Sequence, residues 1–324
     1  MYSHHPRTLR YSLLASLVAS TVLVSACNSD EETSSNTTSK QPKNIILMIN
    51  DGASWGTWEM GAHWQKGVDA NALDVYSSLP VRLGMTTYPL NTDKSPTYND
   101  ISTVGYDAAM AWDNSHGESL KQDGYESTIA GYKYLRRAYT DSAAAGTAMA
   151  TGTKTYNQAI GYSNMNEPLT NITQIAHARN KATGVVTSVQ VSHATPSAFS
   201  AHSPSRYDMV ALAKDQLTNG YVDLLIGTGH PEYDNNGIRV AGMSEAECAA
   251  VSCNWWDVQN PESTIGASEW QALKAGSLTR SGAALPNYLI TSKAEFEALA
   301  AGDLPADLAA GQPLVGIPEV RSTL

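Results

Sequence analysis

Short apolar runs alternate with amphipathic segments along the chain, and this alternation predicts an α/β fold. Residues 44–49 and 185–190 are runs of apolar or β-branched side chains, typical of strands buried on both faces of a parallel sheet. We therefore predict a three-layer αβα sandwich around a mostly parallel central sheet. The same reasoning predicts further strands at 81–87 and 221–226 and amphipathic helices at 170–182 and 209–217.

Polar side chains stand where the first two predicted strands end. Asp51 follows the first run, and His193 and Thr195 follow the second. Ligands of open α/β sheets gather at the carboxyl ends of strands, so Asp51 stands where a metal-binding carboxylate is expected. The alternative for Asp51 is that it only caps the next helix. The two-residue spacing of His193 and Thr195 can aim both side chains at one site.

A run of small residues with strong helix propensity follows Asp141 and begins at Ser142. Ser142 is therefore expected in a first helical turn, where unpaired N–H groups and the helix dipole attract anions. A serine hydroxyl in this place can attack an anionic centre if its pKa is lowered, which a metal would do. Arg206 opens another predicted helical stretch and carries a planar fork suited to a phosphate-like oxyanion.

Taken together, these segments resemble the alkaline phosphatase family. The motifs stand in the family's order: a strand ending N-D-G, then T-D-S-A-A, then H-A-T-P followed by A-H-x-x-x-R. The likeness covers roughly residues 43–229 and fades from His230 onward. The resemblance implies a metal-dependent phosphate monoester hydrolase that works through a phosphoserine intermediate on Ser142.

The resemblance also implies two Zn²⁺ sites and one Mg²⁺ site. Asp51 corresponds to the carboxylate that bridges a zinc and the magnesium ion, and Ser142 to the nucleophile whose oxygen contacts a zinc. Thr195 corresponds to a hydroxyl ligand of the magnesium ion. His193 stands where some family members have aspartate. Because Mg²⁺ prefers oxygen, the histidine implies a weaker or water-mediated contact.

Phosphate binding is implied for Arg206, with Asp141 as the acid that hydrogen-bonds it. The guanidinium would bind the non-transferred phosphoryl oxygens as a bidentate donor. Two cations about 4 Å apart would clamp the attacking and the leaving oxygen. Transfer to serine and then to water splits one difficult step into two easier ones.

The chain departs from the family in its second half. The family completes its zinc sites there with an E-x4-D-x3-H segment, an Asp-His pair and a further histidine. The chain has eight histidines, of which His230 is the last, and it contains no E-x4-D-x3-H segment. We therefore expect residues 1–324 to be an N-terminal portion that is inactive on its own.

Two alternatives to the monoesterase remain open. One is a sister hydrolase of the same superfamily that acts on diesters or sulfate esters. The other is a non-catalytic, lipid-anchored protein that retains a phosphate pocket. Arg206 and the Ser142 motif favour a monoester, whereas the missing downstream ligands are the only support for the non-catalytic alternative.

Residues 1–26 have the pattern of an export signal. Two arginines precede a short apolar run, and small residues stand before Cys27. The letters V-S-A-C at 24–27 resemble a bacterial lipobox, in which Cys27 is lipidated and becomes the mature N-terminus. The alternative is an ordinary signal peptide cut nearby. Residues 27–42 are expected to be a flexible polar tether, so the mature protein would be periplasmic or membrane-anchored.

The composition excludes some partners and leaves others open. The formal charge is −10, and loss of Arg7 and Arg10 with the signal makes it −12, which argues against nucleic acid as a partner. Bound cations would still dominate the field at an anion site. Cys248 and Cys253 are expected to form a small-loop disulfide in an oxidising compartment, with buried free thiols as the alternative.

Residues 43–324 are expected to form one domain with polar, turn-rich excursions at 93–127 and 230–285. Such insertions can shape a pocket or an oligomer contact, which leaves a homodimer open, although a surface excursion is preferred. His202 is expected to serve core hydrogen bonding, and His230 is the best stray candidate for a site. Packing is expected for Trp55, Trp58 and Trp64, and surface or capping roles are expected for His63, His116 and His177.

Overall fold

The computed structural model describes residues 44–67, 78–122, 125–137 and 139–323 of the chain. The chain divides into two units, Met1–Ile49 and Asn50–Leu324. The predicted export signal at 1–26 and the predicted tether at 27–42, with Cys27, lie outside the described residues.

Residues 44–49, predicted as a buried strand, form no strand. The side chains of Ile46 and Met48 are 85% and 89% exposed. The predicted strand at 81–87 is also irregular, and its Leu83 is exposed. Both predictions were wrong for the same reason: an apolar run becomes a buried strand only where a partner strand aligns with it. Periodicity along one segment contains no information about that partner.

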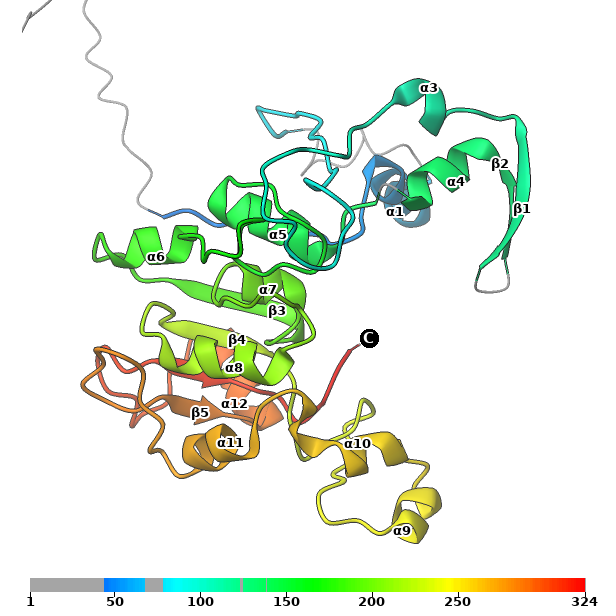
Figure 1. Cartoon of the computed structure of the whole chain (residues 1–324). Helices are drawn as coiled ribbons and strands as arrows, with labels where there is room; N and C mark the ends of the chain where they lie inside the picture. The colour runs from blue at the N-terminus through cyan, green and yellow to red at the C-terminus, as the bar shows by residue number, and fades with distance from the viewer. Residues whose placement is uncertain (1–43, 68–77, 123–124, 138, 324) are drawn as a thin grey trace, which may run out of the picture. The chain divides into compact units, whose positions relative to one another are not determined.

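The unit that begins at Asn50 contains, among its described residues, a four-stranded parallel sheet with helices packed beside it (Figure 1). All of its neighbouring strands are parallel, and helices lie in the connections between them. The predicted fold, a mostly parallel sheet between helices, is confirmed. In spatial order the described strands are β3 (Gly184–Gln190), β4 (Leu224–Thr228), β6 (Leu314–Gly316) and β5 (Tyr288–Ile290).

Helices cover both faces of this sheet. On one face, α8 (Met209–Thr218) and α11 (Ala267–Lys274) pack against alternate strand positions such as Val315. Gly316, the next residue, faces the opposite side, where a Cβ would lie 3.0 Å from the Phe296 ring of α12 (Lys293–Ala301). The buried core on the first face consists of Val191, Ala213, Leu217, Val222, Leu225, Ile265, Trp270, Leu273, Val315 and Ile317.

Four of the six predicted site residues, Asp141, Ser142, His193 and Thr195, lie on two further helices or directly before them. The two helices are α5 (Ser142–Thr151) and α7 (Ala194–Ala198), which pack against each other. A Cβ at Gly146 would lie 2.8 Å from the Cβ of Ala198, closer than real side chains approach. The missing side chain of Gly146 therefore allows α5 and α7 to lie at this short separation.

The predicted helices are confirmed in part. The helix predicted at 209–217 is α8, but the one predicted at 170–182 shrinks to α6 (Ile172–His177). Asn171 caps α6 through its side chain, which accepts a hydrogen bond from the Gln174 N–H. A left-handed residue, Asn180 with φ of 55°, stands shortly after the helix and prevents its continuation.

The segment 93–127 is more regular than predicted. It is irregular only as far as residue 107, after which a short helix leads into an antiparallel hairpin. The tryptophans after Asp51 lie on a helix, as expected, although Trp64 is 90% exposed and packs against little. The described elements of this part of the chain are α1 (Trp55–Lys66), α3 (Ala108–Ala111), β1 (His116–Gln122), β2 (Tyr125–Ile129) and α4 (Ala130–Arg137).

The excursion at 230–285 also contains regular structure that the sequence did not predict. Cys248 and Cys253 form a disulfide within it, with their Cα atoms 5.0 Å apart, so the preferred pairing is confirmed. Besides α11, the segment contains α9 (Glu245–Ala250), α10 (Trp255–Gln259) and the 3₁₀ helix η2 (Pro261–Ser263).

In the described part of the chain, no helix combines the length and the apolar character needed to cross a bilayer.

Candidate functional site

The side chain of Asp141 joins a helix start, a loop and an arginine. As N-cap of α5, its Oδ1 accepts a hydrogen bond from the Ala144 N–H at 2.9 Å, which is why the helix begins where the sequence predicts. Both of its oxygens also accept from the Gln158 N–H at 3.1 Å. Arg206 donates from Nη1 to Oδ2 at 3.2 Å, and both partners of this ion pair are largely buried.

Ser142 is the first residue of α5 and is partly buried. Within the described part of the chain its hydroxyl has no hydrogen-bond partner, so a ligand can reach it without displacing a protein contact. The first turn of the helix leaves backbone N–H groups unpaired, and the positive end of the helix dipole lies here. An anion is therefore favoured next to the Ser142 hydroxyl.

Asp51 meets Thr195, a residue 144 positions later in the chain. The Thr195 hydroxyl, in the first turn of α7, donates to Oδ2 of Asp51 at 2.9 Å. Thr195 in turn lies beside α5, because a Cβ at Gly146 would be 3.8 Å from the Thr195 Cα. The close packing of the two helices thus brings the Asp51–Thr195 pair towards the helix that carries Ser142.

His193, the N-cap residue of α7, lies on the other side of Arg206. Its Nε2 is 3.4 Å from Nη2 of the guanidinium. A guanidinium can only donate, so this contact requires a neutral imidazole with Nε2 as acceptor. Burial and, after it, the charge of Arg206 lower the pKa of His193, while Asp51 opposes the shift. The neutral form is therefore favoured.

We call these six residues the serine–arginine cluster: Asp51, Asp141, Ser142, His193, Thr195 and Arg206. Hydrogen bonds and ion pairs link Asp141, Arg206 and His193, and a hydrogen bond links Thr195 to Asp51. The cluster has two carboxylates and one guanidinium, so an anionic ligand would need added positive charge. The arrangement suits an anion held between Arg206 and the start of α5.

The donors present fit part of a magnesium site but not a zinc site. The Asp51 carboxylate and the Thr195 hydroxyl are hard oxygen donors of the kind Mg²⁺ takes, with water completing its shell. Zinc needs three or four protein ligands in a tetrahedral arrangement. Among the described residues, no group of three His, Cys, Asp or Glu side chains could hold a metal ion.

Sequence reasoning missed Asn157 and Gln158. The buried Asn157 accepts from the Asp141 N–H at 3.2 Å and donates to the Tyr139 carbonyl at 3.2 Å. Gln158 donates its N–H to Asp141 and accepts from the Arg206 N–H at 2.8 Å. These two residues hold Asp141 and Arg206 together through contacts across a loop. No periodicity or motif spacing could have indicated them.

His202 has the structural role that the sequence predicted. Its Nε2 donates to the Leu169 carbonyl at 2.8 Å, and its Nδ1 lies 3.2 Å from the Tyr221 hydroxyl. Burial lowers its pKa, but hydrogen bonds to Asp215 and Leu169 outweigh this effect, so the net pKa is raised. The ring is fully engaged and has no atom left for a ligand.

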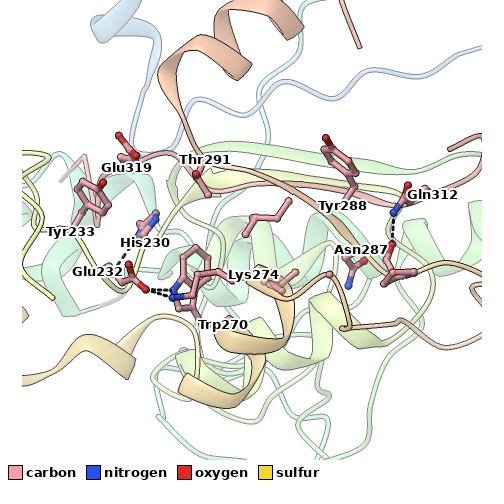
Figure 2. Close-up of a pocket in the computed structure, with 14 residues that line it drawn as sticks. His230, Glu232, Tyr233, Trp270, Lys274, Asn287, Tyr288, Thr291, Gln312 and Glu319 are labelled. Atoms are coloured by element: carbon pink, nitrogen blue, oxygen red, sulfur yellow. Dashed lines mark hydrogen bonds and ion pairs between the residues drawn. The ribbon is translucent and has the colours of Figure 1, made fainter. Parts of the chain in front are cut away.

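His230 lies in a separate pocket of about 550 Å³, shown in Figure 2. Its ring contacts the edges of Tyr233 and Trp270, and Nδ1 accepts from the Glu232 N–H at 3.1 Å. The Glu232 carboxylate is held by Lys274 and by the Trp270 indole N–H. Because these polar groups are bonded to one another and no member of the serine–arginine cluster lines this pocket, we assign it a structural role.

Comparison with known proteins identifies relatives of the segment that contains most of the serine–arginine cluster. Residues 113–233 match the family model for alkaline phosphatase. This part of the chain is alkaline phosphatase-like. The matched stretch contains Asp141, Ser142, His193, Thr195 and Arg206 but not Asp51.

Individual relatives match over short stretches. Alkaline phosphatase 4 of Bacillus subtilis is 46% identical over 84 residues, which are 26% of this chain and 17% of the relative. Alkaline phosphatase 3 of the same organism is 41% identical over 100 residues, 29% of this chain and 22% of the relative. The chain thus matches about a fifth of the length of these relatives. A solved structure, the cold-active alkaline phosphatase of Shewanella sp., is 30% identical with a TM-score of 0.34, covering 57% of this chain and 33% of that one.

Proposed function

We propose that this chain supplies the nucleophile and the phosphate-binding arginine of a metal-dependent phosphate monoester hydrolase. The single observation that carries the proposal is the contact between Arg206 and Asp141, directly before Ser142 at the start of α5. It combines a bidentate cation, a helix N-terminus and an unengaged hydroxyl at one place. The match of residues 113–233 to the alkaline phosphatase family model supports it.

In the proposed reaction, Arg206 binds two of the non-transferred phosphoryl oxygens, and Asp141 keeps its fork in orientation. The Ser142 oxygen gives up its proton and forms a bond to phosphorus, while the ester oxygen leaves with the bonding electron pair and takes up a proton. Water then attacks the phosphoserine and releases inorganic phosphate. The neutral His193 accepts from Arg206 and limits its movement from the second side.

In this proposal, bound metal ions supply the positive charge that the site needs. Asp51 and Thr195 would hold Mg²⁺ with His193 nearby, and Asp51 and Ser142 would contribute to the two Zn²⁺ sites. When bound, such cations neutralise phosphoryl charge and stabilise the attacking oxygen. Because the described residues do not make up a zinc site, we expect residues 1–324 to bind phosphate but to show no turnover. Zinc-dependent turnover by this polypeptide would contradict that expectation.

We also propose that the protein is exported and attached to a membrane through a lipidated Cys27. The apolar run before Cys27 and the V-S-A-C sequence at 24–27 support this proposal. Mass spectrometry of the membrane fraction tests the anchor, which requires a lipid-modified Cys27 at the mature N-terminus.

The decisive test is inorganic phosphate binding to the full chain in the presence of Mg²⁺, measured by calorimetry. Arg206→Lys should weaken binding about tenfold, because a point charge replaces the two-donor fork. Arg179→Lys on the exposed surface is the matched control and should bind as the native chain does. Equal affinities of native and Arg206→Lys chains would overturn the proposal.

Two alternatives are separated by further ligands and by turnover. A sister hydrolase of diesters or sulfate esters predicts that dimethyl phosphate or sulfate competes with phosphate at similar concentrations. The lack of a three-ligand group among the described residues favours a non-catalytic phosphate-binding protein as second candidate. That candidate predicts phosphate binding with no phosphoserine on Ser142, even after the chain is incubated with a monoester and both metals.

A further inference from the structure

A second pocket, of about 570 Å³, opens beside the start of α5. Its wall includes Tyr139 and Thr140, which directly precede Asp141 and Ser142. Since Cα atoms joined by a peptide bond are about 3.8 Å apart, the Cα atoms of Thr140 and Ser142 lie within roughly 8 Å of each other. A small ester bound at Ser142 therefore has the length to enter this pocket, which we call the tyrosine pocket.

The lining of the tyrosine pocket contrasts with the serine–arginine cluster. Among the described residues, no charged side chain lines the pocket, whereas the cluster contains two carboxylates and a guanidinium. A ligand with one charged end and one uncharged end matches this division. The lining side chains with rings or apolar groups are Tyr88, Tyr106, Tyr134, Tyr139, Met85 and Leu135.

Hydrogen bonds hold two walls of the pocket. The Tyr134 hydroxyl donates to the Gly105 carbonyl at 2.7 Å and accepts from the Asp107 N–H at 2.8 Å, which ties the wall containing Tyr106 to α4. On another wall, the Lys154 ammonium lies 3.3 Å from the centre of the Tyr88 ring. The same ammonium donates to the Tyr88 carbonyl. The pocket is thus largely preformed, as ligand pockets usually are.

One side chain couples this pocket to the cluster. Asn157 donates to the carbonyl of Tyr139, a wall residue, and accepts from the N–H of Asp141, the cap of α5. These two hydrogen bonds therefore fix the position of the pocket wall at Tyr139 relative to the start of α5. Tyr106 and Tyr139 are 56% and 57% exposed as residues, which leaves both side chains accessible to a ligand.

We propose that the tyrosine pocket receives the alcohol part of the phosphate ester and selects an aromatic ring there. This inference rests on the proposed function, because it assumes that the phosphoryl group lies between Arg206 and Ser142. Tyrosine faces and edges pair favourably with a planar ring, and the apolar Met85 and Leu135 would be removed from water beside it. Aryl phosphates are then preferred over short alkyl phosphates.

The test compares phenylphosphonate, methylphosphonate and inorganic phosphate as ligands of the full chain with Mg²⁺, measured by calorimetry. Phosphonates keep the anionic end and cannot be hydrolysed, so the result does not depend on turnover. We expect phenylphosphonate to bind about tenfold more tightly than methylphosphonate, the gain typical of one or two aromatic contacts.

Variants of Tyr106 then test whether the phenyl ring of the ligand binds in the tyrosine pocket. Tyr106→Ala should remove most of the preference for phenylphosphonate and leave phosphate affinity unchanged, whereas Tyr106→Leu should keep part of it. Tyr132→Ala is the matched control, because Tyr132 is an exposed tyrosine of α4 that does not line the pocket. The same loss of preference in Tyr106→Ala and Tyr132→Ala would overturn the inference.

The outcomes separate this inference from the proposed function. If phosphate binds but the two phosphonates bind equally, the aromatic subsite is wrong and the phosphate site stands. If none of the three ligands binds, the proposed function fails and the subsite fails with it. A preference for the phenyl compound that is mostly lost in Tyr106→Ala, partly kept in Tyr106→Leu and unchanged in Tyr132→Ala supports both.

Discussion

Arg206 and Asp141 form an ion pair of 3.2 Å in which the carboxylate also caps the helix that carries Ser142. One side chain therefore sets both where α5 begins and how the guanidinium is oriented. A charge-assisted pair of this kind is stronger than a neutral hydrogen bond, and here it is largely buried. Both the free energy of unfolding and the phosphate affinity should therefore depend on Asp141.

Asp141→Ala should lower both the free energy of unfolding and the phosphate affinity. Loss of the cap costs about 1–2 kcal/mol, and the freed Arg206 should bind phosphate about tenfold more weakly. Asp107→Ala is the control, since Asp107 caps α3 and lies outside the serine–arginine cluster; it should lower the free energy of unfolding and leave the phosphate affinity unchanged. Urea unfolding and calorimetry measure the two quantities. Native phosphate affinity in Asp141→Ala would contradict the coupling.

Gly146→Ala should destabilise the chain by about 1–3 kcal/mol, because its Cβ would collide with the Cβ of Ala198 and push α5 from α7. Gly56→Ala is the matched change, since Gly56 lies in α1 with open space around it. It should be neutral or stabilising by up to about 1 kcal/mol. Thermal and urea unfolding compare the two variants. Equal stabilities would show that α5 and α7 are not packed as described.

His230 should make the protein sensitive to mild acid. Burial lowers the pKa of His230 to about 4 in the folded state, below its ordinary value of 6.5. A depressed histidine pKa means that the neutral ring contributes stability above pH 6.5, which is lost as the pH falls towards 4. The difference amounts to about 3 kcal/mol at most.

Urea unfolding at pH 7 and pH 4.5 measures this contribution. The loss of unfolding free energy between these two pH values should be smaller by about 1–3 kcal/mol in His230→Gln than in the native chain. His177→Gln, at an exposed histidine, should behave as the native chain does. Identical acid sensitivity in His230→Gln and the native chain would rule out a buried neutral His230.

Removing one partner of the ion pair between Arg321 and Asp257 should be strongly destabilising. The Nε–Oδ1 distance of the pair is 3.1 Å, and both side chains are almost completely buried. Asp257→Ala leaves a buried guanidinium without its counterion and should cost about 3–5 kcal/mol. The exposed pair Lys293–Glu297 is the comparison, where Glu297→Ala should cost about 0.5 kcal/mol or less. Similar losses in the two variants would contradict the burial of Arg321.

Predictions from the sequence held best where the determining contacts are local. The start of α5 at Ser142 and the helix α8 depend on interactions within one or two turns. The disulfide between Cys248 and Cys253 spans five positions and was also predicted. In contrast, the strands predicted at 44–49 and 81–87 were wrong, because strand formation depends on a partner elsewhere in the chain.

By itself, the sequence determined which residue types are available and where the first turn of α5 begins. It did so because caps, helix propensity and motif spacing act over a few residues. The tertiary structure alone decided that Asp51 meets Thr195, that Asn157 connects Tyr139 to Asp141, and that the tyrosine pocket opens beside Thr140. These contacts arise from the packing of distant segments, whose geometry depends on the whole fold and has no signature in any local pattern.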